Sequence, residues 1–441
     1  MPPIACTHRC LFLRSAFALG LVAFTSACTA GANDEDAGGG SSSGDPTAPG
    51  DTTESGVDAS DSSGDVPVDP SACGATLREV SWFQTVEVPA LTPDGAVDPA
   101  GRAAPLVSNR HAIIRARLDV DADWAPHAVD VRVDVTTGAG TESFTGSAMV
   151  DGSADDSDSG IIVDVPASAM LSGATYSVSI VECDGGGDGV RFPQDREAEL
   201  GVVDTGPIRI HVVPFEVGGF VPDTSPQVLE GFRSAILAMY PATDVELTVL
   251  PVEPDQNNGQ VDMGDLMIRL IVLQEELVFA SGNLDPAVAD IYYYGLVTGA
   301  ATREEFCDTC PTGTSESGVG NRAGSAMGAA FADDLSESTL VHELGHMHGL
   351  LHSPCGDPSL QDDAFPYADG STSVEGWDDR TETFVPPTHN DVMGYCQPRW
   401  VSDYHYAKMV EWIQLAQSWA TASAMEGPPS HPTDRVECFG H

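Results

Sequence analysis

HELGHMHGLLH, at residues 342–352, is the most informative stretch of this 441-residue chain. His342 and His346 are four residues apart, so on a helix both imidazoles project from one face and can bind the same ion. Gly349 can take the left-handed conformation that ends a helix, which lets His352 return as a third ligand. Three neutral nitrogens leave the fourth tetrahedral position open, as a catalytic zinc requires. The spacing therefore predicts one Zn²⁺ at His342, His346 and His352.

Glu343 follows the first of these histidines directly, close to the predicted ion without being a ligand. A zinc ion lowers the pKa of water toward about 7, and a neighbouring carboxylate can take the proton as the water attacks a carbonyl. Glu343 is therefore the predicted general base of a zinc metalloendopeptidase. His348 occupies a variable position of the pattern, and we expect it to contact the ligands from outside or to be exposed. The alternative is a surface-anchored binding or adhesin lipoprotein with a vestigial metal site.

The pattern HExxHxxGxxH is matched at every fixed position and resembles that of the metzincin metallopeptidases. That family carries a methionine-bearing turn beneath the zinc, and NDVMGYC at residues 390–396 is similar to it. The resemblance implies that Met393 forms the floor under the ligands. It also makes Tyr395 a candidate for stabilising the transition state, the alternative being a buried tyrosine that is hydrogen-bonded elsewhere.

A closer resemblance covers roughly residues 340–420. The segments 353–356 (SPCG) and 400–404 (WVSDY), together with the leader, look like the ToxR-regulated lipoprotein group of bacterial metallopeptidases, some of which cut heavily glycosylated proteins. Family architecture implies an edge strand at 323–330 that binds an extended peptide. Asp334 and Glu337 would form a capping box at the start of the active-site helix. Cys355 and Cys396 flank the third ligand and the methionine turn, so we expect a disulfide between them.

Two regions of different periodicity follow one another along the chain. Residues 73–205 alternate between apolar and polar side chains, which predicts a small antiparallel, Ig-like β-sandwich. Residues 206–425 have strand, helix, strand, helix, strand order, which predicts an α/β (α+β) metzincin-type catalytic domain with a mixed sheet and an active-site helix. Ser225 is the expected cap of its first helix. The expected buried stripes of the two helices are Leu229, Phe232, Ile236 and Met239, and Leu266, Leu270, Leu273 and Leu277.

Cysteines and acidic loops give weaker predictions. Cys73 and Cys183 bracket the predicted sandwich and are disulfide candidates. Cys307 and Cys310 have the spacing of a redox motif or half a zinc knuckle, but no second such pair exists, so we favour a disulfide or partners elsewhere. The acidic loops at 151–160 and 184–189 suggest structural Ca²⁺, yet neither has EF-hand spacing, and solvated turns remain the favoured interpretation.

The amino terminus is typical of an exported protein. Residues 1–27 combine two arginines with an apolar run too short to span a bilayer, which predicts a signal peptide. Small residues lead into Cys28, which resembles a bacterial lipoprotein processing site, the alternative being ordinary cleavage and release. Residues 28–72 would hold the lipidation site and a disordered acidic linker. We therefore expect a cell-surface or outer-membrane lipoprotein whose membrane contact is a lipid anchor at Cys28. A tail at 426–441 has no predicted structure.

The charge of the chain excludes some partners. With 67 Asp and Glu against 19 Lys and Arg, the formal net charge is −48. Phosphate backbones and anionic lipid surfaces are recognised through clustered Lys and Arg, which this chain lacks. Nucleic acid is therefore excluded, and the expected partner is a protein or glycoprotein substrate. The same charge disfavours electrostatic steering toward acidic glycoproteins.

Overall fold

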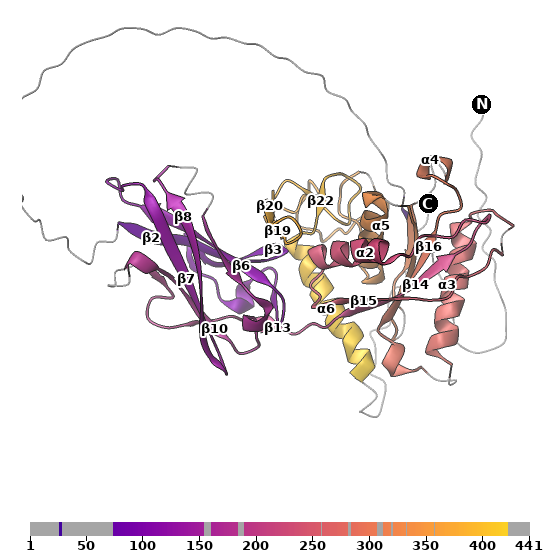
Figure 1. Cartoon of the computed structure of the whole chain (residues 1–441), viewed down its shortest axis with the longest axis horizontal. Helices are drawn as coiled ribbons and strands as arrows, with labels where there is room; N and C mark the ends of the chain where they lie inside the picture. The colour runs from indigo at the N-terminus through magenta and orange to yellow at the C-terminus, as the bar shows by residue number, and fades with distance from the viewer. Residues whose placement is uncertain are drawn as a thin grey trace, which may run out of the picture.

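The computed structural model describes residues 26–28, 74–153, 160–183, 189–256, 258–280, 284–306, 312–318, 321–331, 333–356 and 358–421. Most of the predicted signal peptide, the linker after Cys28 and the predicted tail lie outside these residues, as do Cys73, Cys307 and Cys310. The protein is mixed α/β, with many strands in several sheets and few helices (Figure 1). Among the described residues, no helix is both long and apolar enough to cross a membrane.

Two sheets built largely from residues 75–199 form the N-terminal sheet pair. The larger has the order β20-β19-β3-β2-β6-β9, with β4 beside β3, and the smaller has the order β11-β10-β7-β8, with β12 beside β10. The strands of the larger sheet are β2 (Ala75–Gln84), β3 (Val86–Thr92), β4 (Gly95–Ala96), β6 (Ala112–Val120), β9 (Ile161–Val165), β19 (Gly376–Asp378) and β20 (Thr383–Val385). Those of the smaller are β7 (His127–Thr137), β8 (Gly140–Val150), β10 (Thr175–Ile180), β11 (Arg191–Phe192) and β12 (Ala198–Glu199).

The alternating pattern of β7 puts every second side chain into the core between these sheets. Val129, Val131, Val133 and Val135 are fully buried, and Trp82 of the larger sheet meets Tyr176 of the smaller one edge-on, with ring centroids 5.0 Å apart. β6 departs from the expected half-buried pattern, because its first five residues are buried on both faces. The outer face is covered by the β19–β20 hairpin, whose Trp377 and Phe384 pack with Ile113.

A six-stranded mixed sheet carries the second half of the chain, in the order β1-β17-β18-β16-β14-β15. The strands β14, β15, β16 and β18 are parallel, and β17 runs antiparallel to β18. Their bounds are β1 (Ser26–Cys28), β14 (Ile208–Phe215), β15 (Val245–Val249), β16 (Ile291–Val297), β17 (Gly313–Glu316) and β18 (Ser325–Ala329). The expected edge strand at 323–330 is therefore wrong: β18 lies inside the sheet, and β17 lies between β18 and β1.

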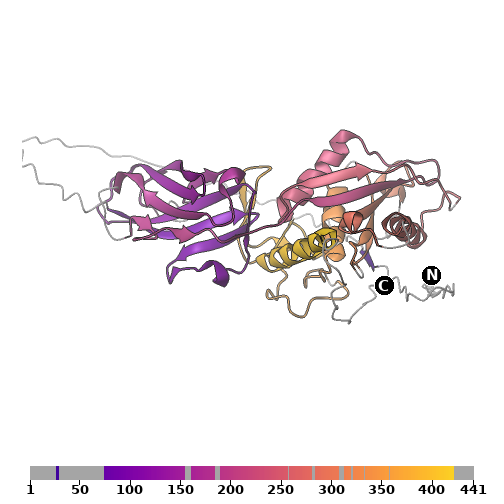
Figure 2. The same cartoon turned by 90° about the horizontal axis from the view of Figure 1, so that it is seen from below.

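Helices cover both faces of this sheet (Figures 1 and 2). One face packs against α2 (Pro226–Met239), α5 (Asp334–Met347) and α6 (Asp403–Thr421), and the other packs against α3 (Met263–Val278). A short α4 (Arg303–Phe306) and the pairs β5 (Leu106–Val107) with β13 (Val202–Val203), and β21 (Asn390–Asp391) with β22 (Arg399–Trp400), complete the fold. The yellow helix α6 lies at the junction between this sheet and the N-terminal sheet pair in both views.

Two predictions about the helices need correction. The buried stripe of α3 runs through Met267, Ile271 and Gln274 as well as Leu266 and Leu270, while Leu277 is 42% exposed. The apolar pattern could not include Gln274, which is buried because its amide donates to the carbonyl of Ala323 (2.8 Å). Ser225 stands at the N-cap of α2, but its hydroxyl makes no capping bond. That hydroxyl donates to Asp223 instead (3.2 Å).

Candidate metal centre

The active-site helix α5 begins at Asp334, and its N-cap residue is Asp333. The carboxylate of Asp333 accepts a hydrogen bond from the main-chain N–H of Ser336 (2.9 Å), so the prediction of Asp334 as the cap of a capping box with Glu337 is wrong. Arg303 adds two side-chain bonds to the same carboxylate (2.6 and 2.7 Å). Burial alone would raise the pKa of Asp333, but Arg303 and Ser336 together lower it. The start of the helix is thus held to α4.

The helix ends at Met347 with His348 as its C-cap, and the next residue, Gly349, has a φ of 75°. The Gly349 N–H donates to the carbonyl of His346 (2.8 Å), and the Leu350 N–H donates to that of Gly345 (3.0 Å). These two bonds form a Schellman motif, which needs a left-handed residue at this position and so favours glycine. The reversal turns the chain back beneath the helix and brings His352 to the two helical histidines.

The three histidines of the motif meet at their Nε2 atoms. His346 Nε2 lies 3.2 Å from His342 Nε2 and 3.0 Å from His352 Nε2. All three side chains are at least 96% buried, and they form the one group of three or more potential metal ligands within the described residues.

Each imidazole uses its other nitrogen to donate to a main-chain carbonyl: His342 to Val392 (2.8 Å), His346 to Leu350 (2.8 Å) and His352 to Ser359 (2.6 Å). A carbonyl can only accept, so Nδ1 carries the proton in each ring and Nε2 presents a lone pair. Burial lowers the pKa of His342 well below its usual value and the pKa of His346 to about 3, and it also lowers the pKa of His352. All three rings are therefore neutral at pH 7.

This donor set fits a zinc ion. Tetrahedral coordination at about 2.0–2.1 Å places two nitrogen ligands roughly 3.3 Å apart, close to the Nε2 separations of 3.2 and 3.0 Å. Three lone pairs that face one another with no proton between them repel unless a cation lies among them. The carbonyls that accept from Nδ1 fix the orientation of each ring, as carbonyl partners of zinc-binding histidines commonly do.

Glu343, which follows the ligand His342 in α5, is fully buried, and β17 shapes its position. A Cβ placed on Gly313 would overlap the Glu343 carboxylate and would lie 2.8 Å from its Cδ. The side chain of Glu343 therefore occupies the space that Gly313 leaves open. The sequence predicts a role for Glu343 but gives no indication of Gly313. The contact between the two residues depends on how β17 packs against α5.

The turn containing Met393 lies directly under the helix. Met393 is fully buried, and its sulfur occupies the place where a side chain on Gly345 would begin. Asp391 holds this turn: its carboxylate accepts from the N–H of Met393 (2.8 Å), the N–H of Ser402 (3.0 Å) and Nδ1 of His405 (2.7 Å). Burial would raise the pKa of Asp391, but His405 and these donors lower it. Neither Asp391 nor His405 was singled out from the sequence.

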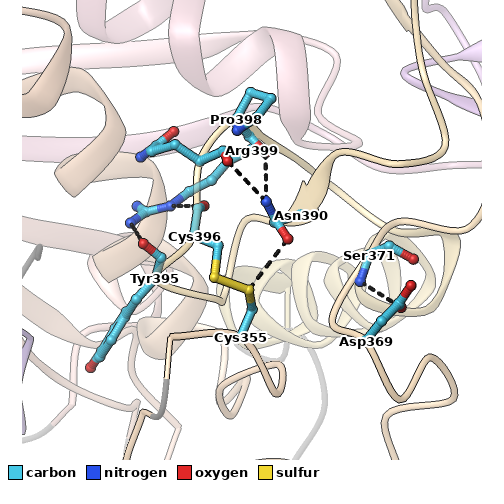
Figure 3. The surroundings of a disulfide bond; sticks show 9 residues. Cys355, Asp369, Ser371, Asn390, Tyr395, Cys396, Pro398 and Arg399 are labelled. Carbon is cyan, nitrogen blue, oxygen red and sulfur yellow. Dashed lines mark hydrogen bonds between the residues drawn. A yellow bond between two sulfur atoms is a disulfide. The ribbon is translucent and has the colours of Figure 1, made fainter. Parts of the chain in front are cut away.

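A disulfide joins Cys355 to Cys396, with Cα atoms 5.7 Å apart (Figure 3). It connects the segment after the third histidine to the segment after the methionine turn. The same two segments are bonded through the Tyr395 N–H and the Cys355 carbonyl (2.9 Å). Cys183 also takes part in a disulfide, and its predicted partner, Cys73, lies outside the described residues.

Tyr395 and Arg399 lie at the rim of the centre. The Tyr395 hydroxyl is 3.3 Å from Nε2 of His352, so it reaches the ligand cluster itself. Arg399 donates to the carbonyls of Tyr395 (3.3 Å) and Cys396 (3.2 Å), which fixes the backbone that carries the tyrosine (Figure 3). The positive charge of Arg399 also contributes to the low pKa values of His342 and His352, after burial.

His348 is separate from the ligand cluster. It is 3% exposed, and its two nitrogens have no hydrogen-bond partner among the described residues. Its ring lies among Tyr240, Tyr292 and Trp412, with centroid distances of 5.3, 5.2 and 6.3 Å. Burial lowers its pKa to about 3, so it is a neutral core residue packed among these aromatic rings.

Residues 292–411 match the model of the peptidase M66 family. The match supports a metallopeptidase. It spans β16 to the first half of α6 and includes the three histidines, Glu343 and Met393. A search of curated proteins found none that matches this chain. The N-terminal sheet pair lies outside the matched segment, apart from β19 and β20.

Proposed function

We propose that the protein is an exported zinc endopeptidase with a metzincin-type catalytic domain preceded by an Ig-like β-sandwich. The observation that carries the proposal is the convergence of three neutral Nε2 atoms, each oriented by a carbonyl, beside the buried carboxylate of Glu343. His342, His346 and His352 would hold the ion. Zinc supplies a Lewis acid that polarises a carbonyl and makes water acidic enough to react at neutral pH.

The residues of the chain divide the remaining work. The Glu343 carboxylate takes a proton from the attacking water and delivers it to the nitrogen of the leaving amine. The Tyr395 hydroxyl, beside His352, donates a hydrogen bond to the oxygen on which negative charge develops. Met393 and Asp391 hold the floor beneath the ligands.

The sheet supports a substrate bound in extended conformation. β17 already pairs antiparallel with a short segment, because Ser26–Cys28 lies along it with Cys28 opposite Gly313. Pairing through the main chain needs no free terminus, so an internal stretch of a protein can bind in the same way. Gly313 also faces Glu343, which places the paired segment next to the base. Processing at Cys28 would remove Ser26 and Ala27 and free the positions opposite Ser315 and Thr314 for substrate.

The proposal includes export and anchoring through Cys28, as in the ToxR-regulated lipoprotein group. The disulfide between Cys355 and Cys396 supports an oxidising compartment, since such bonds persist mainly outside the cytosol. The substrates would be extracellular proteins, glycoproteins among them.

Metal removal tests the proposal. The purified full-length protein is incubated with a panel of proteins that includes a heavily glycosylated one, as prepared, after chelation, and after Zn²⁺ is returned. We expect cleavage that chelation abolishes and zinc restores. Chelator-insensitive cleavage, or a zinc-loaded folded protein that cleaves nothing in the panel, would contradict it.

A further inference from the structure

Thr85, at the turn between β2 and β3, makes hydrogen bonds to residues from the second half of the chain. It has a φ of 72° and is 2% exposed. A positive φ is rare for a β-branched residue and persists only where the surroundings hold it. Its carbonyl accepts from the Trp377 N–H and from Nε1 of Trp400, both at 2.9 Å, and its hydroxyl donates to the carbonyl of Ala238 (3.0 Å).

Arg110 completes this contact. Its guanidinium donates to the Thr85 hydroxyl (2.6 Å), to the Leu237 carbonyl (2.8 Å) and to the Tyr240 carbonyl. Those carbonyls belong to the C-terminal end of α2, where a positive charge is favourable. Arg110 is 8% exposed, so the bonds form away from water, where leaving a polar partner unpaired is costly.

The indole of Trp400 connects Thr85 to the metal centre. Trp400 lies in β22, which pairs with β21 so that Trp400 is opposite Asp391. The carboxylate of Asp391 holds the methionine turn, and the carbonyl of Val392 in that turn accepts from Nδ1 of His342. The chain of direct contacts from Thr85 to the first ligand therefore runs through Trp400, Asp391 and Val392.

The same turn also contacts the β19–β20 hairpin. β19 extends the sheet of β3, with Gly376 opposite Val86. Arg115, 3% exposed, pairs with Glu375 and lies over the ring of Phe384 at 4.6 Å. A side chain on Gly376 would overlap the Trp400 indole. In sequence, the β19–β20 hairpin lies between the third histidine and the methionine turn. In the structure, it is held by the N-terminal sheet pair.

We infer that Thr85 is a positioning residue for the metal centre, acting through Trp400 on the turn that holds His342. The effect on catalysis rests on the proposed function. The effect on metal binding and on the turn can be measured without any enzyme activity. Groups that hydrogen-bond a metal ligand directly typically change metal affinity or activity by 10- to 100-fold when they are lost. Thr85 acts on one such group, the Val392 carbonyl, through Trp400 and Asp391.

The test uses Trp400→Phe, which removes the N–H that reaches Thr85 and keeps an aromatic ring. Trp124→Phe is the matched control, because the Trp124 indole also donates to a carbonyl, that of Val150 (3.0 Å), within the N-terminal sheet pair. Thr85→Val keeps the carbonyl that Trp400 reaches but removes the hydroxyl through which Ala238 and Arg110 hold the turn in place, and Thr85→Ser retains that hydroxyl. This second pair decides the question if Trp400→Phe fails to fold.

Three readouts are compared in the full-length proteins: the rate of zinc release to excess chelator, the visible spectrum of the Co²⁺ form, and amide hydrogen exchange at residues 391–402 without metal. We expect about tenfold faster zinc release, an altered cobalt spectrum and faster exchange in Trp400→Phe and Thr85→Val. Trp124→Phe and Thr85→Ser should match the wild type.

Wild-type values of all three readouts in folded Trp400→Phe and Thr85→Val would overturn the inference. That result leaves the proposed function intact, because the wild-type enzyme would still cleave. Conversely, a wild-type protein that binds zinc but cleaves nothing refutes the proposed function. Zinc release and hydrogen exchange in the variants would still test whether Thr85 positions the metal centre.

Discussion

The position of Glu343 depends on a residue that has no side chain. Gly313 lies on β17 against the Glu343 carboxylate, and a methyl group there would occupy the same space. The chemistry assigned to Glu343 requires its oxygens at the edge of the ligand cluster, so a shift of about 1 Å is expected to matter.

We expect Gly313→Ala to lower kcat by at least about 100-fold, the usual contribution of a positioned general base, while zinc content stays at the wild-type level. Gly101→Ala is the control, because a Cβ at Gly101 meets no atom within 4 Å. Steady-state kinetics with metal analysis checks both. A folded, zinc-loaded Gly313→Ala protein with wild-type kcat would show that Glu343 tolerates displacement.

Glu316, at the other end of β17, gives a prediction about pH. Burial raises the pKa of Glu316 to about 7 from an ordinary 4.5, the charge of Arg322 opposing this and that of Glu275 adding to it. Since the folded state binds the proton more tightly than the unfolded state, stability from this group falls as pH rises from about 4.5 through 7.

Glu316→Gln should therefore raise the free energy of unfolding at pH 8 by at most about 3 kcal/mol, with the difference shrinking toward pH 4.5. Glu142→Gln, at an exposed site, should change little at either pH. Urea unfolding at both pH values measures this. An equal effect of Glu316→Gln at pH 5 and pH 8 would contradict the assignment.

At the level of single residues, the sequence predicts those site residues that lie close to one another along the chain. His342, His346, Gly349 and His352 fall within one turn and a half of helix and its reversal, so their geometry follows from helical periodicity. Asp391 of β21 and His405 of α6 are 14 residues apart, and Gly313 is 30 residues from Glu343. Their contacts depend on sheet order and on the path of loops, which residue types do not reveal.

Among the secondary-structure elements, α5 carries two of the three histidines, so we expect its N-cap, Asp333, to affect both stability and zinc binding. Asp333→Ala removes the bonds to Ser336 and Arg303, and we expect a loss of about 1–2 kcal/mol in the free energy of unfolding. Asp262→Ala at the N-cap of α3 removes bonds to Gly264 and Asp265 and should cost a similar amount.

The two variants should differ in their effect on zinc. α5 carries two of the three histidines, so only Asp333→Ala is expected to release zinc faster than the wild type. Chelator competition measures the rate, and chemical denaturation measures stability. Equal zinc release from both variants would mean that the start of α5 is uncoupled from the centre.

Sequence periodicity predicted the strand, helix, strand, helix, strand order that opens the second region, and β14, α2, β15, α3 and β16 follow it. It was less successful where an element is covered from outside. β6 is buried on both faces because a hairpin some 260 residues later packs on it, and the buried face of α3 includes Gln274. An alternating sequence pattern shows that one face of a strand is buried. It does not show whether a later segment of the chain covers the other face.

At the scale of the whole molecule, the two regions share one core. A single apolar cluster runs from Trp82 and Val131 through Ile210 and Leu344 to Trp419, and the larger N-terminal sheet includes β19 and β20. The change of periodicity near residue 206 does not predict this shared core. Periodicity depends on neighbouring residues along the chain, whereas the core depends on how the two regions pack together.

Residues 206–441 expressed alone should therefore fold poorly. Removing residues before 206 leaves the edge of β19, the Trp400 N–H and the carbonyls at the end of α2 without partners, and it exposes the core they border. We expect a lower midpoint of thermal unfolding than for residues 73–441, and loss of zinc. An isolated fragment that unfolds at the temperature of the longer protein would contradict this continuity.

The most direct test of the account is peptide hydrolysis by Glu343→Gln protein of verified zinc content, beside a Glu411→Gln control on the exposed side of α6. The account predicts one zinc per chain and an unchanged circular dichroism spectrum in both variants. It predicts a fall in kcat/KM of at least about 100-fold in Glu343→Gln alone. Cleavage within a fewfold of the wild-type rate by zinc-loaded Glu343→Gln would contradict the proposal that this carboxylate moves the proton.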